Sequence, residues 1–356
     1  MRRVWVIALL AVAGVSVMVA RGDVSCEVLA TQPACDVALR PGPTEDALQL
    51  ITVEGVEAHT STGELRMTTV AVQDDLGLTA WLRARTSDVV DAVPRRQIFP
   101  PGTDGGEVAE RNAALMADSQ LVATIAALTQ LGFELTGEGA LVAALTEDAV
   151  TDELAVGDVI VAVDGERVQD SLDVVEAVRA RRPGTRISLT IAADDGRRTV
   201  DVVLGDSTAE PGTPYIGILL TTELELPVDI AIDAGVIGGP SAGLMFALSI
   251  VDLLGPDDLT GGAIIAGTGT VDRDGLVGAV GGVRQKVVGA TTVEPPDDAA
   301  TVFLVPQANL AEARSTSVAR DVLLVPVETL TDALAALEAL REGREPAGAL
   351  ALGPLR

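Results

Sequence analysis

Residues 1–22 constrain most strongly where and how this chain can fold, because they have the pattern of a membrane-targeting segment. Met1-Arg2-Arg3 precedes an apolar run over residues 4–20, and Arg21-Gly22 follows it. A basic start before such a run is typical of a signal peptide or an uncleaved anchor. Cleavage after Ala20 would put Met18 at the −3 position, where small residues are preferred. We therefore expect a single-pass transmembrane anchor in the cell membrane, with the remaining domains extracytoplasmic. A buried core helix is the alternative.

The two cysteines and the single histidine limit the cofactors that the chain could hold. Cys26 and Cys35 follow the apolar segment, and an even number of cysteines outside the cytoplasm permits a disulfide. His59 lies in a polar stretch and is interpreted as a surface residue. Three such side chains are too few for a convincing zinc or haem site, so we expect no metal and no cofactor.

Charge and composition exclude two further classes of function. The formal net charge of −27 argues against binding a nucleic acid backbone. Hydrophobic residues make up 48% and aromatic residues 2% of the chain, which predicts aliphatic cores in two or three domains. Lys286 is the only lysine and Val287 follows it, so a G-x-x-x-x-G-K-[ST] phosphate loop is absent from the sequence. We expect no ATPase module in this chain.

The first half of the chain predicts a linker, strands and one long helix. Residues 23–44 are expected to be a linker that includes Pro41-Gly42-Pro43. Short β-branched runs over residues 48–72 predict strands in a hairpin or meander. Apolar residues at helical spacing then predict a helix over residues 107–131.

Residues 132–206 resemble a PDZ domain of the kind found in bacterial envelope proteases. The resemblance rests on Leu154-x-x-Gly157-Asp158-Val159-Ile160, Val163-Asp164-Gly165 and Pro183-Gly184. It implies a β-rich domain that binds extended peptides by adding a strand to a sheet edge. A small β-rich domain of another type is the alternative. The nearest candidate for a carboxylate-binding loop is 136–139, although Glu138 would repel a carboxylate.

From Tyr215 onward the sequence alternates between strand and helix patterns, which indicates an α/β architecture. The segment 343–356, rich in Gly, Pro and Ala, is expected to be an unstructured tail. The expected elements are strands at 228–231, 263–266, 302–306 and 322–327, and helices at 241–254, 282–291, 308–313 and 330–340.

Ser241 and Lys286 are the candidates for chemistry. Ser241 follows Gly238-Gly239-Pro240 at the start of an apolar helix, which suits a nucleophile beside free backbone N–H groups, although an ordinary helix cap fits the same residues. A serine hydroxyl needs a base. A buried lysine can lose its proton, whereas arginine cannot. Because 24 of the 25 basic residues are arginine, a lysine at position 286 indicates that a titratable amine is needed there.

The two motifs together resemble the proteolytic domain of the Lon-type serine proteases. Gly239-Pro240-Ser241-Ala242-Gly243 matches the family's G-P-S-A-G, and Gly281-Gly282-Val283-Arg284-Gln285-Lys286 matches its G-G-x-x-x-K helix. The resemblance implies a Ser241–Lys286 dyad with backbone support from Gly239, Pro240 and Ala242. It also implies mixed sheets with helices, and subunits that often form rings.

The resemblance extends upstream, and it also has departures. Met116-Ala117-Asp118-Ser119 is similar to a helix of the Lon-type fold, which places the first part of that fold at 45–131 and the second at 212–342, with the PDZ-like segment inserted between them. Ala266 stands where the family has a threonine near the lysine, so Thr268 or Thr270 is the candidate for orienting the amine. Gly238 replaces an acidic residue of many relatives, so no third catalytic carboxylate is expected.

We therefore expect an ATP-independent serine endopeptidase that is tethered to the membrane and cleaves peptides or proteins of the cell envelope. An inactive envelope scaffold that binds peptide tails is the main alternative. A carboxy-terminal processing peptidase ranks below both, because such enzymes have a shorter serine-to-lysine spacing and lack G-P-S-A-G.

Overall fold

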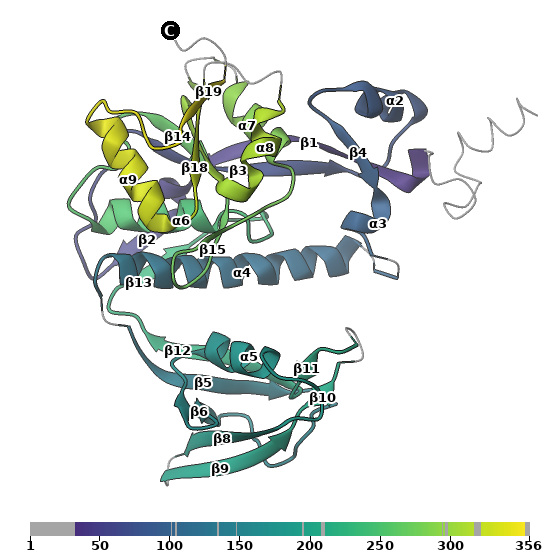
Figure 1. The fold of residues 1–356 in the computed structure, drawn as a ribbon, viewed down its shortest axis with the longest axis vertical. Helices are drawn as coiled ribbons and strands as arrows, with labels where there is room; N and C mark the ends of the chain where they lie inside the picture. Colours follow the sequence, from purple (N-terminus) through teal and green to yellow (C-terminus); the bar gives the residue numbers. More distant parts are fainter. Residues whose placement is uncertain are drawn as a thin grey trace, which may run out of the picture. The chain divides into compact units, whose positions relative to one another are not determined.

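The computed structural model describes residues 33–352, without residues 101, 104, 134, 147, 194–195, 208–210, 294, 296–297 and 317–321. The chain forms two compact units. Of the described residues, the first contains 33–132 and 229–352, and the second contains Phe133–Val228 (Figure 1). In the described residues no helix has the length and apolar character needed to cross a bilayer. The expected anchor, residues 1–22, lies outside them, as does Cys26. Cys35 is buried and is not a free thiol.

A seven-stranded sheet organises the first unit, in the order β19-β18-β17-β14-β3-β1-β4. Strands β3, β14, β17 and β18 run parallel, while β1, β4 and β19 pair antiparallel with their neighbours. The strands are β1 (Asp36–Asp46), β3 (Glu64–Gln73), β4 (Asp91–Pro94), β14 (Ile264–Gly267), β17 (Val302–Pro306), β18 (Val322–Val327) and β19 (Leu350–Leu352).

Helices cover both faces of this sheet, so its central strands are buried on two sides. In β17, Val302 and Leu304 join one hydrophobic core and Phe303 and Val305 join the other, as the period of two in a strand requires. The first core contains α4 (Gly105–Gln130), α6 (Gly243–Leu254) and α9 (Leu330–Arg341). The second contains α7 (Val283–Thr291) and α8 (Leu310–Arg314).

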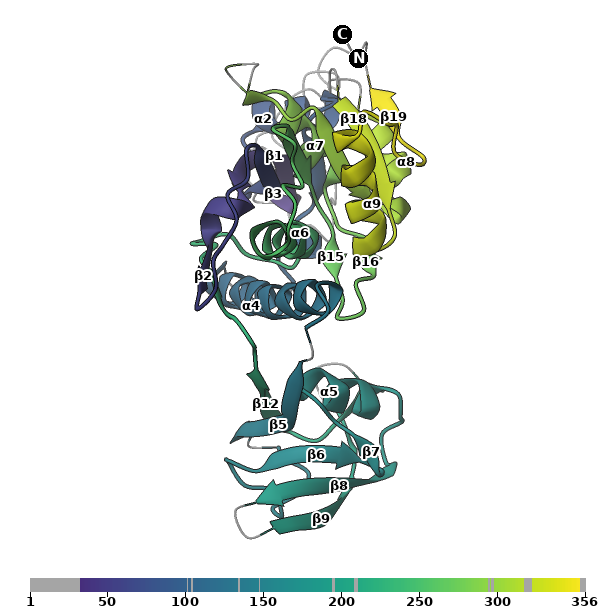
Figure 2. The same ribbon diagram turned by 90° about the vertical axis from the view of Figure 1, so that its left-hand side faces the viewer.

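Helix α6 lies between the sheet and α4 (Figures 1 and 2). Its residues from Gly243 to Asp252 are all buried, as expected for a helix that is apolar on every side. Two short ribbons complete this core: β2 (Ile51–Glu54) with β13 (Asp229–Ile232), and β15 (Thr270–Val271) with β16 (Val277–Gly278).

A small module lies at the β4 edge of the sheet. Helix α2 (Leu78–Thr86) packs on β1 and β4 through Ala84, Ala38 and partly buried Trp81. Helix α3 (Arg95–Ile98) follows β4 directly. Asp36, which is only 2% exposed, accepts hydrogen bonds from Trp81 Nε1 and from Arg85 at 2.7 Å and 2.6 Å. These contacts fix α2 on the first residue of β1.

The second unit is a β-rich fold with one helix, α5 (Ser171–Arg179). Its main sheet has the order β12-β5-β6-β8-β9, and β7 pairs with β6. A separate core is built from alternating residues such as Ile187, Leu189 and Ile191. The strands are β5 (Thr136–Leu145), β6 (Val159–Val163), β7 (Glu166–Arg167), β8 (Arg186–Ala193), β9 (Gly196–Val203), β10 (Gly205–Asp206), β11 (Pro214–Tyr215) and β12 (Ile218–Glu225).

The predicted mixture of sheets and helices is present, and the helix predicted at 107–131 is confirmed as α4. Several boundaries were wrong. The 48–72 region forms no hairpin, because β2 pairs with β13 and β3 lies between β1 and β14. β1 begins at Asp36, within the expected linker, and bulges at Pro41 so that the proline is accommodated. β19 lies within the expected tail, because it extends the sheet beside β18.

Candidate active site

Ser241 and Lys286 lie in direct contact. Lys286 Nζ is 2.6 Å from Ser241 Oγ and donates to Thr268 Oγ1 at 2.8 Å. Thr268 in turn donates its hydroxyl proton to the carbonyl oxygen of Ser241 at 3.0 Å. Because this proton is committed, the Thr268 oxygen is available to accept from the amine. The structure therefore places Thr268 beside the lysine, as one of the two predicted candidates. Thr270 lies in β15, where its side chain faces Gly278.

Glycine and small residues shape the turn that leads into α6. Gly239 has φ +90°, in the region that favours glycine, and its N–H donates to Asn112 O at 2.8 Å. A Cβ on Gly243 would lie 3.0 Å from Ser119 Oγ, so α4 approaches α6 closely at this point. Ser119 Oγ also donates to Pro240 O at 3.1 Å. These contacts hold the segment that carries Ser241.

The N–H groups of Ser241 and Ala242 differ from that of Gly239. Neither the N–H of Ser241 nor that of Ala242 donates a hydrogen bond to any described residue. Pro240 has no N–H to donate, and the N–H of Gly239 is already used. Of the three residues expected to give backbone support, only Ala242 therefore presents a donor, together with Ser241 itself. The first N–H groups of a helix are the ones that lack partners within it.

Burial changes the acidity of Lys286. Its side chain is only 3% exposed, and this burial lowers its pKa to about 8, while the negative charge of Glu312 opposes the shift. Such a pKa leaves a useful fraction of uncharged amine near neutral pH. Arginine could not supply it.

Glu312 also holds the start of α7, and the sequence did not single it out. Glu312 Oε1 accepts from Val283 N at 3.0 Å, and its other oxygen accepts from Asn309 Nδ2 at 3.3 Å. Asn309 in turn bonds both the N–H and the C=O of Val280, at 2.9 Å and 3.0 Å. An acidic residue in the short helix expected at 308–313 is the signal that could have pointed to Glu312.

A cleft of about 740 Å³ opens beside Ser241. Among the residues that line it, Lys286 alone is charged, and most of the others are small or aliphatic. The lining residues are Pro43, Met67, Thr68, Thr69, Val70, Ala71, Ala109, Asn112, Ala113, Met116, Gly235, Val236, Ile237, Gly238, Ser241, Ala242, Gly281 and Lys286.

One wall of this cleft is an open strand edge. β3 pairs with β14 only over 64–67 but continues to Gln73 along β1. The N–H of Glu64 faces the β14 side, donating to Ala263 O at 3.1 Å. Backbone groups alternate along a strand, so those of Thr68 and Val70 face the same side. Thr68 is only 4% exposed and donates its side-chain hydroxyl to Gly267 O at 3.0 Å, so the side that no described strand covers begins at Val70.

His59 is exposed, as predicted, and does not line the cleft. Its backbone N–H donates to Leu253 O at 2.8 Å, which places it near the far end of α6 from Ser241. The described residues contain no group of three or more His, Cys, Asp and Glu side chains that could hold a metal ion.

Comparison with known proteins identifies part of the second unit. Residues 129–204 match the PDZ domain family model. The segment is a PDZ domain. Over 76 residues the chain is 41% identical to a probable periplasmic serine endoprotease, DegP-like, of Pseudomonas fulva, which covers 21% of this chain. The matched part is only 16% of that relative.

Two solved structures are similar to about a quarter of the chain. The PDZ domain of the SdrC-like protein of Listeria monocytogenes is 26% identical, covering 25% of this chain and 93% of its own, with a TM-score of 0.23. A solution structure from Geobacillus thermodenitrificans is 25% identical, covering 23% and 95%, with a TM-score of 0.21.

The expected carboxylate-binding loop of the PDZ domain was wrong. Residues 136–139 are part of β5, where Thr136 and Gly137 pair with β12. β12 is an edge strand of the sheet, and α5 packs on β5 and β12. The turn before β12 contains Gly217, with φ +82°, whose carbonyl accepts from Thr146 N at 2.9 Å. The second unit extends to Val228 and includes β11 and β12, although the sequence from Tyr215 onward was assigned to the α/β region.

Proposed function

We propose that the chain is an ATP-independent serine endopeptidase of the Lon-like type, with Ser241 as nucleophile and Lys286 as general base. The 2.6 Å contact between a buried amine and a serine hydroxyl at the start of a helix carries this proposal. The G-P-S-A-G and G-G-x-x-x-K motifs support the Lon-like type. The match to the PDZ region of a serine endoprotease supports a role in proteolysis.

In the proposed reaction, Ser241 Oγ attacks the carbonyl carbon of a peptide bond while uncharged Lys286 takes its proton. The lysine then gives this proton to the leaving amine, and an acyl ester remains on Ser241. Water attacks the ester carbonyl while Lys286 accepts its proton. Lys286 then returns this proton to Ser241 Oγ as the ester C–O bond breaks, which releases the carboxylate product after loss of its acid proton to solvent. Thr268 accepts a hydrogen bond from the amine throughout and holds Nζ near Oγ.

The developing oxyanion needs donors that are not already used. The N–H groups of Ser241 and Ala242 meet this condition, and that of Gly239 does not. We therefore assign oxyanion support to Ser241 and Ala242. The open side of β3 supports an extended substrate that pairs its backbone with Val70.

The remaining expectations belong to the same proposal. The PDZ domain would bind extended peptides along the free edge of β12 and select or deliver them. The segment 1–22 would tether the enzyme to the cell membrane, with both units outside the cytoplasm. A homo-oligomeric ring is a further expectation that the Lon-like type brings.

The test uses the full-length protein in detergent. A fluorophosphonate probe should label the wild type and not Ser241→Ala, and casein turnover should disappear in Lys286→Arg, which keeps the positive charge but cannot act as a base. Labelling of Ser241→Ala, or turnover by Lys286→Arg, would exclude this mechanism. An unlabelled, inactive wild type that still binds peptide tails would favour the scaffold alternative.

A further inference from the structure

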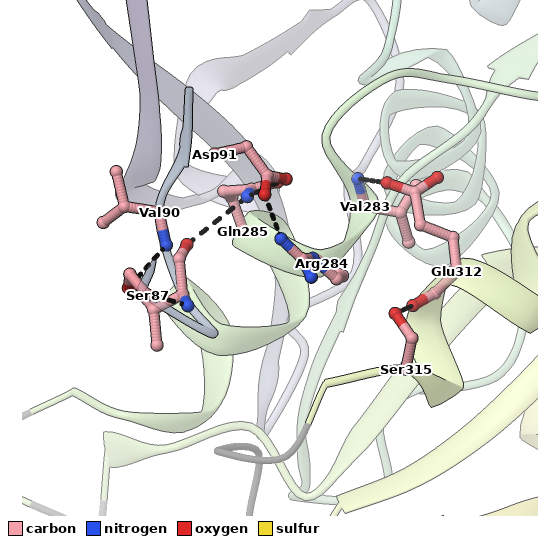
Figure 3. A network of polar contacts seen from close by, with 9 residues as sticks. Ser87, Val90, Asp91, Val283, Arg284, Gln285, Glu312 and Ser315 are labelled. Atoms are coloured by element: carbon pink, nitrogen blue, oxygen red, sulfur yellow. Dashed lines mark hydrogen bonds and ion pairs between the residues drawn. The ribbon is translucent and has the colours of Figure 1, made fainter. Parts of the chain in front are cut away.

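The start of α7 is attached to the rest of the first unit at three consecutive residues. Val283 donates its N–H to Glu312 of α8. Arg284 forms an ion pair with Asp91 of β4, and Gln285 Nε2 donates to the other oxygen of the same carboxylate at 2.7 Å. The next residue is Lys286. Figure 3 shows these contacts, with Asp91 between the loop that contains Val90 and the first turn of α7.

Three such attachments determine the rotation of the helix about its axis. Side chains of successive residues in an α-helix point about 100° apart, so Arg284 and Gln285 reach Asp91 from two directions. The backbone N–H of Val283, which points along the helix axis, holds the end of the helix on α8. Anchors on all three leave the helix little freedom to rotate, and the direction of Lys286 is set with it. The two contacts of Asp91 are the ones that come from the β4 side.

Asp91 contributes to the position of α7 through its hydrogen bond from Gln285 as well as through its ion pair with Arg284. Its side chain is 37% exposed and that of Arg284 is 23% exposed, so solvent screens their attraction. Gln285, in contrast, is fully buried. Its amide nitrogen has one other described partner, Val89 O at 3.3 Å. Removal of Asp91 would leave this buried amide poorly paired, and the first turn of α7 would have to adjust.

We propose that Asp91 is a positioning residue, which fixes the rotation of α7 and thereby holds Lys286 Nζ against Ser241 Oγ. This inference rests on the proposed dyad. Asp91 does not line the cleft and touches neither of the two reacting side chains. It acts through Arg284 and Gln285. A displacement of about 1 Å between reacting groups can cost about 100-fold in rate.

The loop that presents Asp91 is itself well defined. Ser87 Oγ accepts from the N–H groups of Val89 and Val90, both at 3.1 Å, which closes a tight turn before β4. Partly buried Val90 packs against the core of the α2 module. The carboxylate is therefore presented to α7 from a fixed support.

Charged groups near Lys286 determine what a change in its pKa would mean. Glu312 of α8 is the charged group that raises the pKa of Lys286, and burial lowers it. β1 and β3 also pack on α7, and where they meet the cleft they present Pro43, Thr68 and Val70, none of which titrates. Loss of position would let water reach the amine and raise its pKa above about 8. Loss of a negative charge alone would lower it.

The experiment compares Asp91→Ala and Asp91→Asn with wild type in the full-length protein. Asp91→Ala should lower kcat for a fluorogenic peptide about 10- to 100-fold with KM little changed. Asp91→Asn keeps one acceptor oxygen and should lose less. Arg284→Met, which removes the contact from the α7 side, should resemble Asp91→Ala. Asp74→Asn is the matched control, because Asp74 forms an exposed ion pair with Arg95 in the same region and does not touch α7.

A second readout needs no peptidase activity. Lys286 is the only lysine, so its rate of acetylation against pH, followed by mass spectrometry of its peptide, reports its pKa directly. That pKa should rise in Asp91→Ala and stay unchanged in Asp74→Asn. If the wild type hydrolyses nothing but this shift is seen, the positioning role holds and the proposed peptidase does not. An unchanged or lowered pKa with wild-type kcat overturns the inference. The inference is also overturned if kcat falls only because Asp91→Ala, Asp91→Asn and Arg284→Met are unfolded, which would appear as the absence of a cooperative melt in all three.

Discussion

Thr268 Oγ1 links the two halves of the candidate site, accepting from Lys286 Nζ at 2.8 Å and donating to Ser241 O at 3.0 Å. The side chain is fully buried, so neither bond competes with solvent. One hydroxyl therefore connects the proposed base to the backbone of the proposed nucleophile.

Replacing this hydroxyl tests its role. Thr268→Val keeps the shape of the side chain but removes both bonds, so we expect kcat to fall about 10- to 100-fold while KM changes little. Thr268→Ser is the control, because it keeps the hydroxyl and should retain most of the activity. Steady-state kinetics on a fluorogenic peptide give the comparison. Equal activity of the valine and serine variants would exclude a role for the hydroxyl.

Glu312→Gln should move the pH dependence of the reaction. The negative charge of Glu312 raises the pKa of Lys286, so the neutral amide should lower that pKa. The base must be uncharged to work, so kcat/KM should rise at lower pH than in the wild type, whose acidic limb is expected near pH 8. The amide oxygen can still accept from Val283 N. A pH–rate profile measures the shift, and an upward displacement of the limb would contradict it.

Lys286 should cost the folded protein stability at neutral pH. Its folded pKa of about 8 is below the ordinary 10.5, so between these values the unfolded chain binds more protons. The contribution of Lys286 to the free energy of unfolding therefore rises with pH between about 8 and 10.5 and is least favourable below about pH 8. Lys286→Met should melt at a higher temperature than the wild type at pH 7, and the difference should narrow between pH 8 and pH 10. If the difference in melting temperature is constant over this range, folding does not lower the pKa of Lys286.

Gly63→Ala should destabilise the first unit. An added Cβ would lie 2.3 Å from Ala263 O, and this is a backbone atom that cannot move aside without shifting β14. We expect a loss of about 1–3 kcal/mol in the free energy of unfolding. Gly77→Ala is the control, because nothing lies within 4 Å of its added Cβ. Thermal or urea unfolding measures the free energy of unfolding of both variants. Equal values would show that the backbone where β3 meets β14 shifts enough to accommodate the added Cβ at no measurable cost.

Much of the fold could be predicted where local patterns carry it. The apolar run of α6 and the alternation of helices and strands after it predicted elements whose ends lie within two residues of those observed. The pairing of Ser241 with Lys286 was expected from the chemistry of the single lysine and from a resemblance, because no periodicity joins two such distant positions.

The contacts of Asp91 could not be predicted in the same way. Asp91 lies 194 residues from Gln285, and its neighbours carry no motif. The pairing of β1 with β3 was hidden for a different reason. Pro41-Gly42-Pro43 has the composition of a loop, yet a bulge lets β1 pass through it and stay paired with β3. Register and bulges depend on tertiary partners, so sequence patterns alone did not specify them.

The unpaired side of β3 sets a requirement on any substrate that would use it. A polypeptide can satisfy those backbone groups only with N–H and C=O groups of its own that are not engaged elsewhere. Helices and interior strands of a native protein have none to spare. Such a cleft would thus accept frayed ends, exposed loops and misfolded chains while sparing intact neighbours, and this discrimination would need no energy from a nucleotide.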